Sequence, residues 1–298
     1  MRAAALQIKE SSSDRIFLGF VYLFLTVVLI AVLYPLAYIV SASLSSPAAV
    51  SSGRVWLYPV ELSFDGYIAV FKNPQVITGY ANSLFYTIIG TFISVVLTIM
   101  IAYPLSRKTI FGRGPITLFI MFTMLFSGGL IPTYLVVKTF GLIDTRFALL
   151  LPSAIWVWQV IISRTFFQSS IPDELAEASQ IDGCSDIRFI TSIVIPLSKP
   201  IIAVIALMYA VGQWNAYFDA LIYLKTQSLY PLQLILRSIL VLNNASSNVD
   251  ALEMLKRQQL AELMKYSLIV VASLPVILIY PFVQRYFVQG MLIGSVKG

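Results

Sequence analysis

The chain has 298 residues, of which 58% are hydrophobic and 11% are charged, and its mean hydropathy is +0.85. Soluble domains are about one-quarter charged, so this composition excludes an ordinary water-soluble domain and indicates a protein embedded in membrane lipid. The net charge of +6 is too dilute and scattered to indicate nucleic-acid binding. The absence of His and the presence of a single Cys, Cys184, exclude an internal disulfide and argue against metal and triad chemistry.

Long uncharged stretches mark the candidate transmembrane helices. Each is about as long as the roughly 20 residues that a helix needs to cross the hydrocarbon. Each is apolar at both odd and even positions, whereas a barrel strand would alternate apolar and polar residues. The first stretch is too long for the apolar core of a signal peptide, so we expect it to be retained. We predict an all-α integral membrane fold with six transmembrane helices, at 16–40, 80–104, 115–137, 147–167, 200–224 and 266–288.

The distribution of basic residues predicts the orientation. The short loop 104–115 contains Arg107, Lys108 and Arg113, and the leader 1–15 also contains three bases. The longer loop 41–79 contains only two bases, so the positive-inside rule places the amino terminus in the cytoplasm. With six spans in 16–288, the tail 289–298 and the loop 168–199 are then cytoplasmic, and the loops 41–79 and 225–265 are external.

The cytoplasmic loop 168–199 contains signals for two short helices. Ser170 and Asp173 have capping-box spacing, and Gly183 can end the first helix in a left-handed turn. Ser185 can cap the second helix. The expected apolar face of that second helix consists of Ile187, Ile190 and Val194. The first helix is thin because Ala176, Ala178 and Ser179 are small, so another protein could approach it closely. From the residues alone, an ordinary amphipathic loop on the membrane surface is the favoured interpretation.

The same loop carries the sequence Glu177-Ala178-Ser179, three residues, Gly183, nine residues, and Ile193-Val194-Ile195-Pro196. It resembles the signature loop of binding-protein-dependent ABC importer permeases, whose pattern is Glu-Ala-Ala, three residues, Gly, nine residues and Ile-x-Leu-Pro. The chain departs from the pattern at Ser179 and at Ile195, and both substitutions keep the size and character of the side chain. The resemblance extends over residues 15–298 and includes four further segments, at 130–134, 141–145, 213–215 and 290–298.

Within that family, the chain resembles the carbohydrate branch, and in particular its second, maltose-permease-like subunit. It is also similar to the subgroup that handles larger or acidic oligosaccharides, such as alginate-oligosaccharide permeases. The resemblance implies a type I importer permease in a bacterial inner membrane, with both termini in the cytoplasm. It also implies the residues that couple the chain to an ATPase, namely Glu177, Ala178, Ser179, Gly183, Ile193 and Pro196.

The resemblance further implies the partners of the chain: a second permease chain, two ATPase subunits and an extracytoplasmic solute-binding protein. The sequence has no Gly-x-x-x-x-Gly-Lys-Ser/Thr phosphate loop, so ATP and Mg²⁺ are expected on the ATPase subunits and no cofactor on this chain. The chain itself is then not an enzyme. The other classes that we considered are an ion-coupled secondary transporter and an integral-membrane enzyme, but neither repeated halves nor a catalytic constellation is visible.

Two further segments are candidates for contact with solute or binding protein. The candidate solute path lies late in the fifth span and combines aromatic rings with amide and carboxylate groups, at Trp214, Asn215, Tyr217 and Asp219. The alternative for the aromatic residues is anchoring at the membrane interface. The candidate binding-protein contact consists of Asn243, Asn244, Ser246, Ser247 and Asn248, supported by an amphipathic helix over 250–265. The alternative there is a surface spacer.

Overall fold

The computed structural model describes residues 11–242 and 251–295, and within these residues every regular element is helical. The described residues form two compact units. One contains residues 11–70 and 251–271, and the other contains residues 71–242 and 272–295. The last helix, α15 (Ala251–Ser295), contributes to both units.

The first unit is built on α1 (Ser12–Ser43), a 32-residue apolar helix whose surface is almost entirely exposed. α2 (Pro47–Ser51) and the beginning of α3 (Asp65–Lys72) follow it. The Ser41 hydroxyl donates to the Leu57 carbonyl at 2.6 Å and so fixes the connecting loop to the last turn of α1. A small core joins these elements to the first part of α15 and consists of Ala42, Ala49, Val50, Val55 and Leu263.

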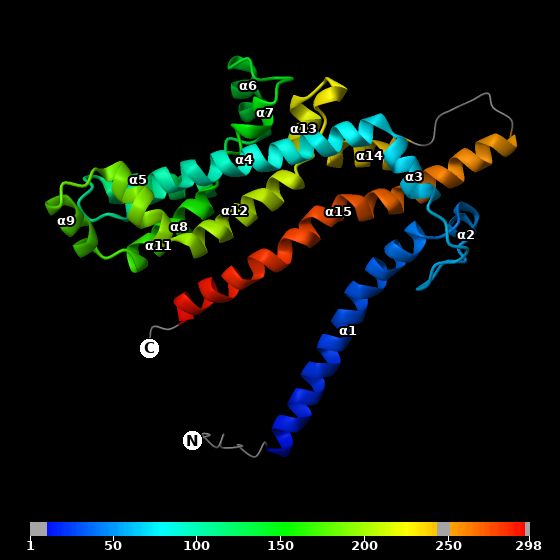
Figure 1. Ribbon diagram of the computed structural model, residues 1–298, viewed down its shortest axis with the longest axis horizontal. Coiled ribbons are helices and arrows are strands. Elements are labelled where there is room, and N and C mark those ends of the chain that lie inside the picture. The colour runs from blue at the N-terminus through cyan, green and yellow to red at the C-terminus, as the bar shows by residue number, and fades with distance from the viewer. Residues whose placement is uncertain (1–10, 243–250, 296–298) are drawn as a thin grey trace. The chain divides into compact units, whose positions relative to one another are not determined.

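The second unit is organised around α4 (Pro74–Ser106), which packs against α8 (Val157–Ser170), α12 (Lys199–Trp214) and α14 (Leu232–Leu242) (Figure 1). The start of α4 is fixed locally, because Pro74 suits the first turn and the Asn73 side chain accepts the Gln75 backbone N–H at 3.0 Å. α4 and α12 approach closely at Gly90. A Cβ added there would lie 2.9 Å from Cδ of Gln213, so any other residue would have to displace the Gln213 side chain.

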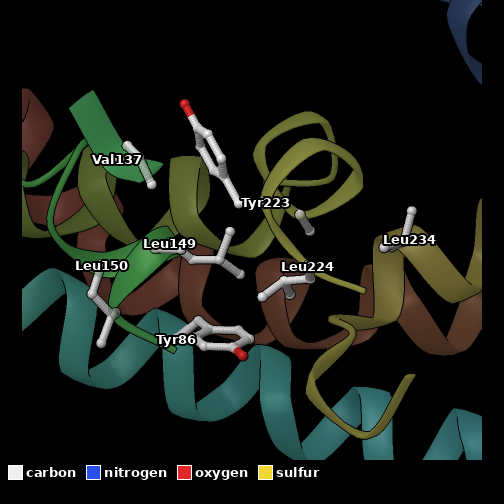
Figure 2. Close-up of a cluster of buried hydrophobic side chains, with 9 residues drawn as sticks. Tyr86, Val137, Leu149, Leu150, Tyr223, Leu224 and Leu234 are labelled. Carbon is white, nitrogen blue, oxygen red and sulfur yellow. The ribbon is translucent and has the colours of Figure 1, made fainter. Parts of the chain in front are cut away.

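Shorter helices complete this unit, and two apolar clusters stabilise it. Figure 2 shows the first cluster, in which Tyr86 of α4 and Leu149 lie close to Leu224. The second cluster lies around the carboxyl-terminal part of α4 and is described with the site below. The shorter helices in the first half of this unit are α5 (Arg113–Leu125), α6 (Leu130–Thr139) and α7 (Phe147–Leu150). α13 (Phe218–Tyr223) and a 3₁₀ turn (Gln227–Leu229) follow α12.

The helical fold class is confirmed, whereas the count of six spans stays a prediction. Among the described residues, three helices are long and apolar enough to cross a membrane: α1, α4 and Gln258–Pro281 of α15. Two bent pairs raise the number to five if each pair is one span. These pairs are α5 with α6, at 113°, and Asp186–Leu197 with α12, at 85°.

The fourth and fifth predicted spans differ from the observed helices. In place of one helix over 147–167, the structure has the short α7, a break that contains Pro152, and the 14-residue α8. Proline removes a backbone donor and clashes with the preceding turn, which accounts for the break. Helix α12 ends at Trp214, well before the predicted end at 224. The separate amphipathic helix that we expected over 250–265 is the beginning of α15.

Candidate functional site

The first helix of the signature loop, residues 168–199, is α9 (Asp173–Ile181). It begins after Pro172, and the Ser170 side chain forms no cap, because Ser170 is the last residue of α8; the expected capping box is therefore wrong. The acidic side chains of Asp173 and Glu174 lie in the first turn, where they complement the positive end of the helix dipole.

Gly183 ends the turn after α9, as predicted. Its φ of +72° is in the left-handed region, and the Cys184 backbone N–H donates to the Ser179 carbonyl at 2.9 Å. A Cβ added to Gly183 would meet nothing within 4 Å. The glycine is thus required by backbone conformation and not by space.

The signature residues divide between an exposed and a buried side of α9. Glu177 and Ala178 are exposed, and Ile181 at the end of the helix is 87% exposed. Ser179 is buried, and its hydroxyl donates to the Ala176 carbonyl at 2.8 Å. One face of α9 is therefore available to another protein, while the other packs within this chain.

The second part of the loop departs from the expected single helix. Ser185 precedes α10 (Asp186–Phe189) but forms no side-chain cap, and a π-helical turn (Ile190–Val194) and α11 (Ile195–Leu197) follow. The π turn adds a residue to the helical repeat and rotates the face that follows it. Ile190, Ile193 and Val194 accordingly pack inside, whereas Ile187 is exposed, against our expectation. Pro196 is exposed and lies within α11.

An apolar cluster attaches this loop to α4 and α8. Phe167 of α8 meets Tyr103 of α4 edge-on, with ring centroids 6.0 Å apart, and Phe189 of α10 lies 6.3 Å from the same tyrosine ring. Burial of these side chains contributes through the hydrophobic effect, at about 1.5–3 kcal/mol for a fully buried large side chain. The buried members of the cluster are Ile99, Ala102, Tyr103, Val160, Phe167, Ile171, Ala176, Phe189 and Val194.

The candidate solute-path residues do not form one surface. Trp214 is 3% exposed, and its indole N–H donates to the Ala272 carbonyl of α15 at 2.9 Å. It is a packing residue in this chain and lacks the exposed ring face that sugar stacking requires. Asn215 and Tyr217 are exposed. The Asp219 carboxylate accepts a hydrogen bond from the Ser153 hydroxyl at 3.3 Å.

Tyr217 has a neighbour that the sequence did not indicate. The guanidinium carbon of Arg237, on α14, lies 5.6 Å from the centroid of the Tyr217 ring, and both side chains are exposed. The two residues are 20 positions apart, and the contact depends on how α14 packs beside α13. The exposed guanidinium can bind a carboxylate, and the part of the Tyr217 ring that Arg237 leaves uncovered can contact a sugar.

Asp144 forms a second arrangement that sequence analysis missed. Its carboxylate accepts the Thr226 hydroxyl at 2.6 Å and the backbone N–H groups of Lys225 and Thr226 at 2.8 Å each. The hydrogen bond from the Thr226 hydroxyl, followed by the backbone N–H bonds, lowers the pKa of Asp144 below its ordinary value of 3.8. These three hydrogen bonds from Lys225 and Thr226 to Asp144, which we call the Asp144 clasp, fix the segment that leads towards α14. Residues 243–248, which include the predicted binding-protein contact, lie outside the described residues.

No group of three or more His, Cys, Asp or Glu side chains in the described ranges 11–242 and 251–295 is arranged to hold a metal ion. The site therefore consists of an exposed helix on a packed support, a separate aromatic–cation pair and a polar clasp. The exposed side of α9 offers a surface on which another protein can dock.

Comparisons with known proteins agree with this interpretation. The protein LplC of Bacillus subtilis strain 168 is 42% identical over 265 residues, which cover 89% of each chain. The polygalacturonan/rhamnogalacturonan transport system permease protein YtcP of the same organism is 41% identical over 286 residues, covering 96% of this chain and 99% of that protein.

A solved structure and a family description complete the comparison. The structure, a crystal structure of a bacterial ABC transporter involved in the import of the acidic polysaccharide alginate, contains a chain that is 37% identical to this one. The match covers 94% of this chain and 100% of that chain, with a TM-score of 0.87. Because residues 76–293 also match the family described as the binding-protein-dependent transport system inner membrane component, the chain belongs to that family and is a non-enzymatic permease subunit of an ABC transporter.

Proposed function

We propose that this chain forms half of the translocation path of an ATP-driven importer for oligosaccharides. A second permease chain would form the other half, two ATPase subunits would bind ATP and Mg²⁺, and an extracytoplasmic binding protein would deliver the solute. The observation that carries the proposal is α9: a short helix, ended by Gly183, with Glu177 exposed and its opposite side packed on α4 and α8.

In this proposal, α9 is the coupling helix and inserts into a cleft of an ATPase subunit. The movement of two such helices would convert the path between inward-open and outward-open states. Shifting such an equilibrium from 1:99 to 99:1 requires about 5.5 kcal/mol of differential binding, which ATP together with a docked partner can supply. A firmly attached α9 suits this task, because a loose helix would absorb the movement.

The proposal includes an orientation. Both termini and the loop 168–199 would be cytoplasmic, and 41–79 and 225–265 would be external, as the bases Arg107, Lys108 and Arg113 favour. A Gln180→Cys substitution in a Cys184→Ser background, probed with an impermeant maleimide, should react in inside-out vesicles and stay unlabelled in intact cells. Labelling in intact cells would contradict this orientation.

The chemistry of the solute is proposed from the relatives and from one contact. Both the polygalacturonan/rhamnogalacturonan permease protein and the alginate importer are named for acidic polysaccharides. Arg237 over Tyr217 offers a guanidinium for a carboxylate beside a ring for the sugar face. We therefore propose oligosaccharides that contain uronic acids as the solute class. Asn243, Asn244, Ser246, Ser247 and Asn248 are proposed to contact the binding protein.

The experiment that tests the proposed function is uptake in cells that express the two permease chains and the binding protein, with and without the ATPase. Uptake should require the ATPase, and an ATPase whose phosphate-loop lysine is replaced should not restore it. This inactive ATPase is the matched control, because it assembles but cannot hydrolyse ATP. Uptake that continues without any ATPase would instead indicate a secondary transporter.

A further inference from the structure

α9 is connected to α4 by an ionic bridge as well as by apolar packing. The Asp173 carboxylate lies between two bases of the segment that follows α4. Its Oδ1 is 3.4 Å from Nη2 of Arg107, and its Oδ2 is 3.1 Å from Nζ of Lys108. We propose that Asp173 is the positioning residue of the coupling helix and acts through this bridge to fix the angle between α9 and α4. This inference rests on the proposed coupling function of α9.

The two arms of the bridge are unequal. The Arg107 side chain is 13% exposed, Asp173 is 35% exposed, and Lys108 is 77% exposed. Solvent and salt screen exposed pairs strongly, so the Arg107 arm carries most of the interaction. Asp173 is also the first residue of α9, where a carboxylate interacts favourably with the helix dipole.

The backbone around Arg107, on the basic side of the bridge, is held by two hydrogen bonds. The Arg107 backbone N–H donates to the Pro104 carbonyl at 3.0 Å, which continues the last turn of α4. From α8, Nε of Arg164 donates to the Leu105 carbonyl, also at 3.0 Å. Because α4 and α8 hold this end of the chain together, Asp173 is connected to a rigid element and not to a free loop.

The bridge residues also line open pockets. Two cavities, of about 260 and 540 Å³, adjoin the bridge, and Arg107, Lys108 and Asp173 line both. Glu174 and Leu175 in the first turn of α9 are exposed, so packing alone does not hold this turn. The ionic bridge spans this open region.

α4 extends the connection to the opposite end of the second unit. There the Asn82 side-chain amide donates to the Ser228 carbonyl at 2.7 Å, and the Tyr86 hydroxyl donates to the Leu229 carbonyl at 2.9 Å. These contacts hold the segment that leads into α14. The 33-residue helix α4 therefore connects the segment before α14 with the ionic bridge to Asp173 of α9. Loss of the bridge should therefore weaken the communication between these two ends. It should affect the binding of the ATPase to the permease pair much less.

The test uses the complete transporter, with both permease chains and the ATPase, reconstituted in proteoliposomes with loaded binding protein. The variants are Asp173→Asn, the pair Arg107→Gln with Lys108→Gln, and all three changes together. Glu174→Gln is the matched control, because it removes the same charge from the same first turn but has no ion pair among the described residues. Asp173→Glu tests rescue by a conservative change.

We expect Asp173→Asn to reduce stimulation of ATP hydrolysis by the loaded binding protein about fivefold or more, in the range of typical coupling between sites. The amount of ATPase bound to the permease pair should stay unchanged, and Asp173→Glu should recover most of the stimulation. Once Arg107 and Lys108 are replaced, adding Asp173→Asn should reduce the stimulation no further than Glu174→Gln does, because only the interaction with the helix dipole is then left to lose.

A spin label at Ile181, introduced as Ile181→Cys in the Cys184→Ser background, reports the mobility of α9 in the permease pair without the ATPase. The lines of its continuous-wave spectrum should narrow in Asp173→Asn, because the label becomes more mobile, and remain as in the parent in Glu174→Gln. Unchanged stimulation in Asp173→Asn, an equal loss in Glu174→Gln, or additive effects of the two sides of the bridge would each overturn the inference. Failure of the unsubstituted permease pair to bind the ATPase would instead contradict the proposed function.

Discussion

The hydroxyl oxygens of Thr98 on α4 and Tyr209 on α12 lie 2.7 Å apart, and both side chains are buried. The Tyr209 hydroxyl oxygen also accepts the backbone N–H of Trp156, just before α8, at 3.1 Å. One phenol therefore joins the three elements that form the centre of the second unit. Because Thr98 and Tyr209 are both fully buried, water does not reach these bonds to replace them, so each partner depends on the others.

Replacing this phenol should destabilise the protein. Tyr209→Phe leaves the Thr98 hydroxyl and the Trp156 N–H without a partner, and an unsatisfied buried group costs about 1–3 kcal/mol. We expect a lower melting temperature in detergent, measured by intrinsic fluorescence. Tyr22→Phe on exposed α1 is the matched control and should leave the melting temperature unchanged. Equal melting temperatures for Tyr209→Phe and the parent would contradict this role.

Gly183 should matter for coupling through its backbone. Gly183→Val must place a β-branched residue at φ near +72°, at a cost of roughly 1–2 kcal/mol or more, although its side chain has space. The variant should still accept loaded binding protein but hydrolyse ATP poorly in response. Gly183→Asn is the control, because asparagine tolerates the left-handed region better, and it should retain more of the response. Normal transport by Gly183→Val would argue against α9 as the coupling helix.

The Asp144 clasp should respond to pH in a defined direction. Its pKa is lowered in the folded protein, so its contribution to stability is present above 3.8 and is lost as the pH falls through the folded pKa. Asp144→Asn keeps the size of the side chain but loses the charge. The difference in melting temperature between parent and variant should be constant from pH 7 to about pH 5 and shrink only below 3.8. A difference that disappears near neutral pH would exclude the carboxylate as its cause.

Arg237 should distinguish acidic from neutral solutes. Arg237→Gln removes the cation beside Tyr217, so uptake of an oligosaccharide with uronic acids should fall about tenfold, as for the loss of one charge-assisted hydrogen bond. Uptake of a neutral oligosaccharide of equal length should change little. Arg237→Lys keeps the charge but not the planar fork and should give an intermediate value. Equal losses for both solutes would indicate a structural role.

The sequence predicted the features that depend on neighbouring residues. The end of α9 follows from Gly183, because a glycine permits the left-handed turn, whereas the start was misplaced because Ser170 belongs to α8. The helical class itself follows from long runs without charge.

Features that depend on distant parts of the chain were not predictable. The bridge from Asp173 to Arg107 joins residues 66 positions apart, and nothing in either local sequence indicates the other. Trp214 is buried because α15 passes beside it, so its aromatic character alone suggested the wrong surroundings. The π turn (Ile190–Val194) arises within a sequence that would also suit a regular helix, which is why the exposure of Ile187 was missed.

The most direct test of the central claim, that α9 docks into an ATPase, is the protection of Ile181. This apolar side chain is 87% exposed at the end of α9, and a docked partner should cover it. The measurement is the rate of maleimide labelling of Ile181→Cys in a Cys184→Ser background, for the permease pair alone and after addition of the ATPase. Labelling should be fast in the permease pair and fall at least about tenfold when the ATPase is bound, because buried interface positions exclude water. Equal labelling rates in a complex that contains stoichiometric ATPase would contradict the account.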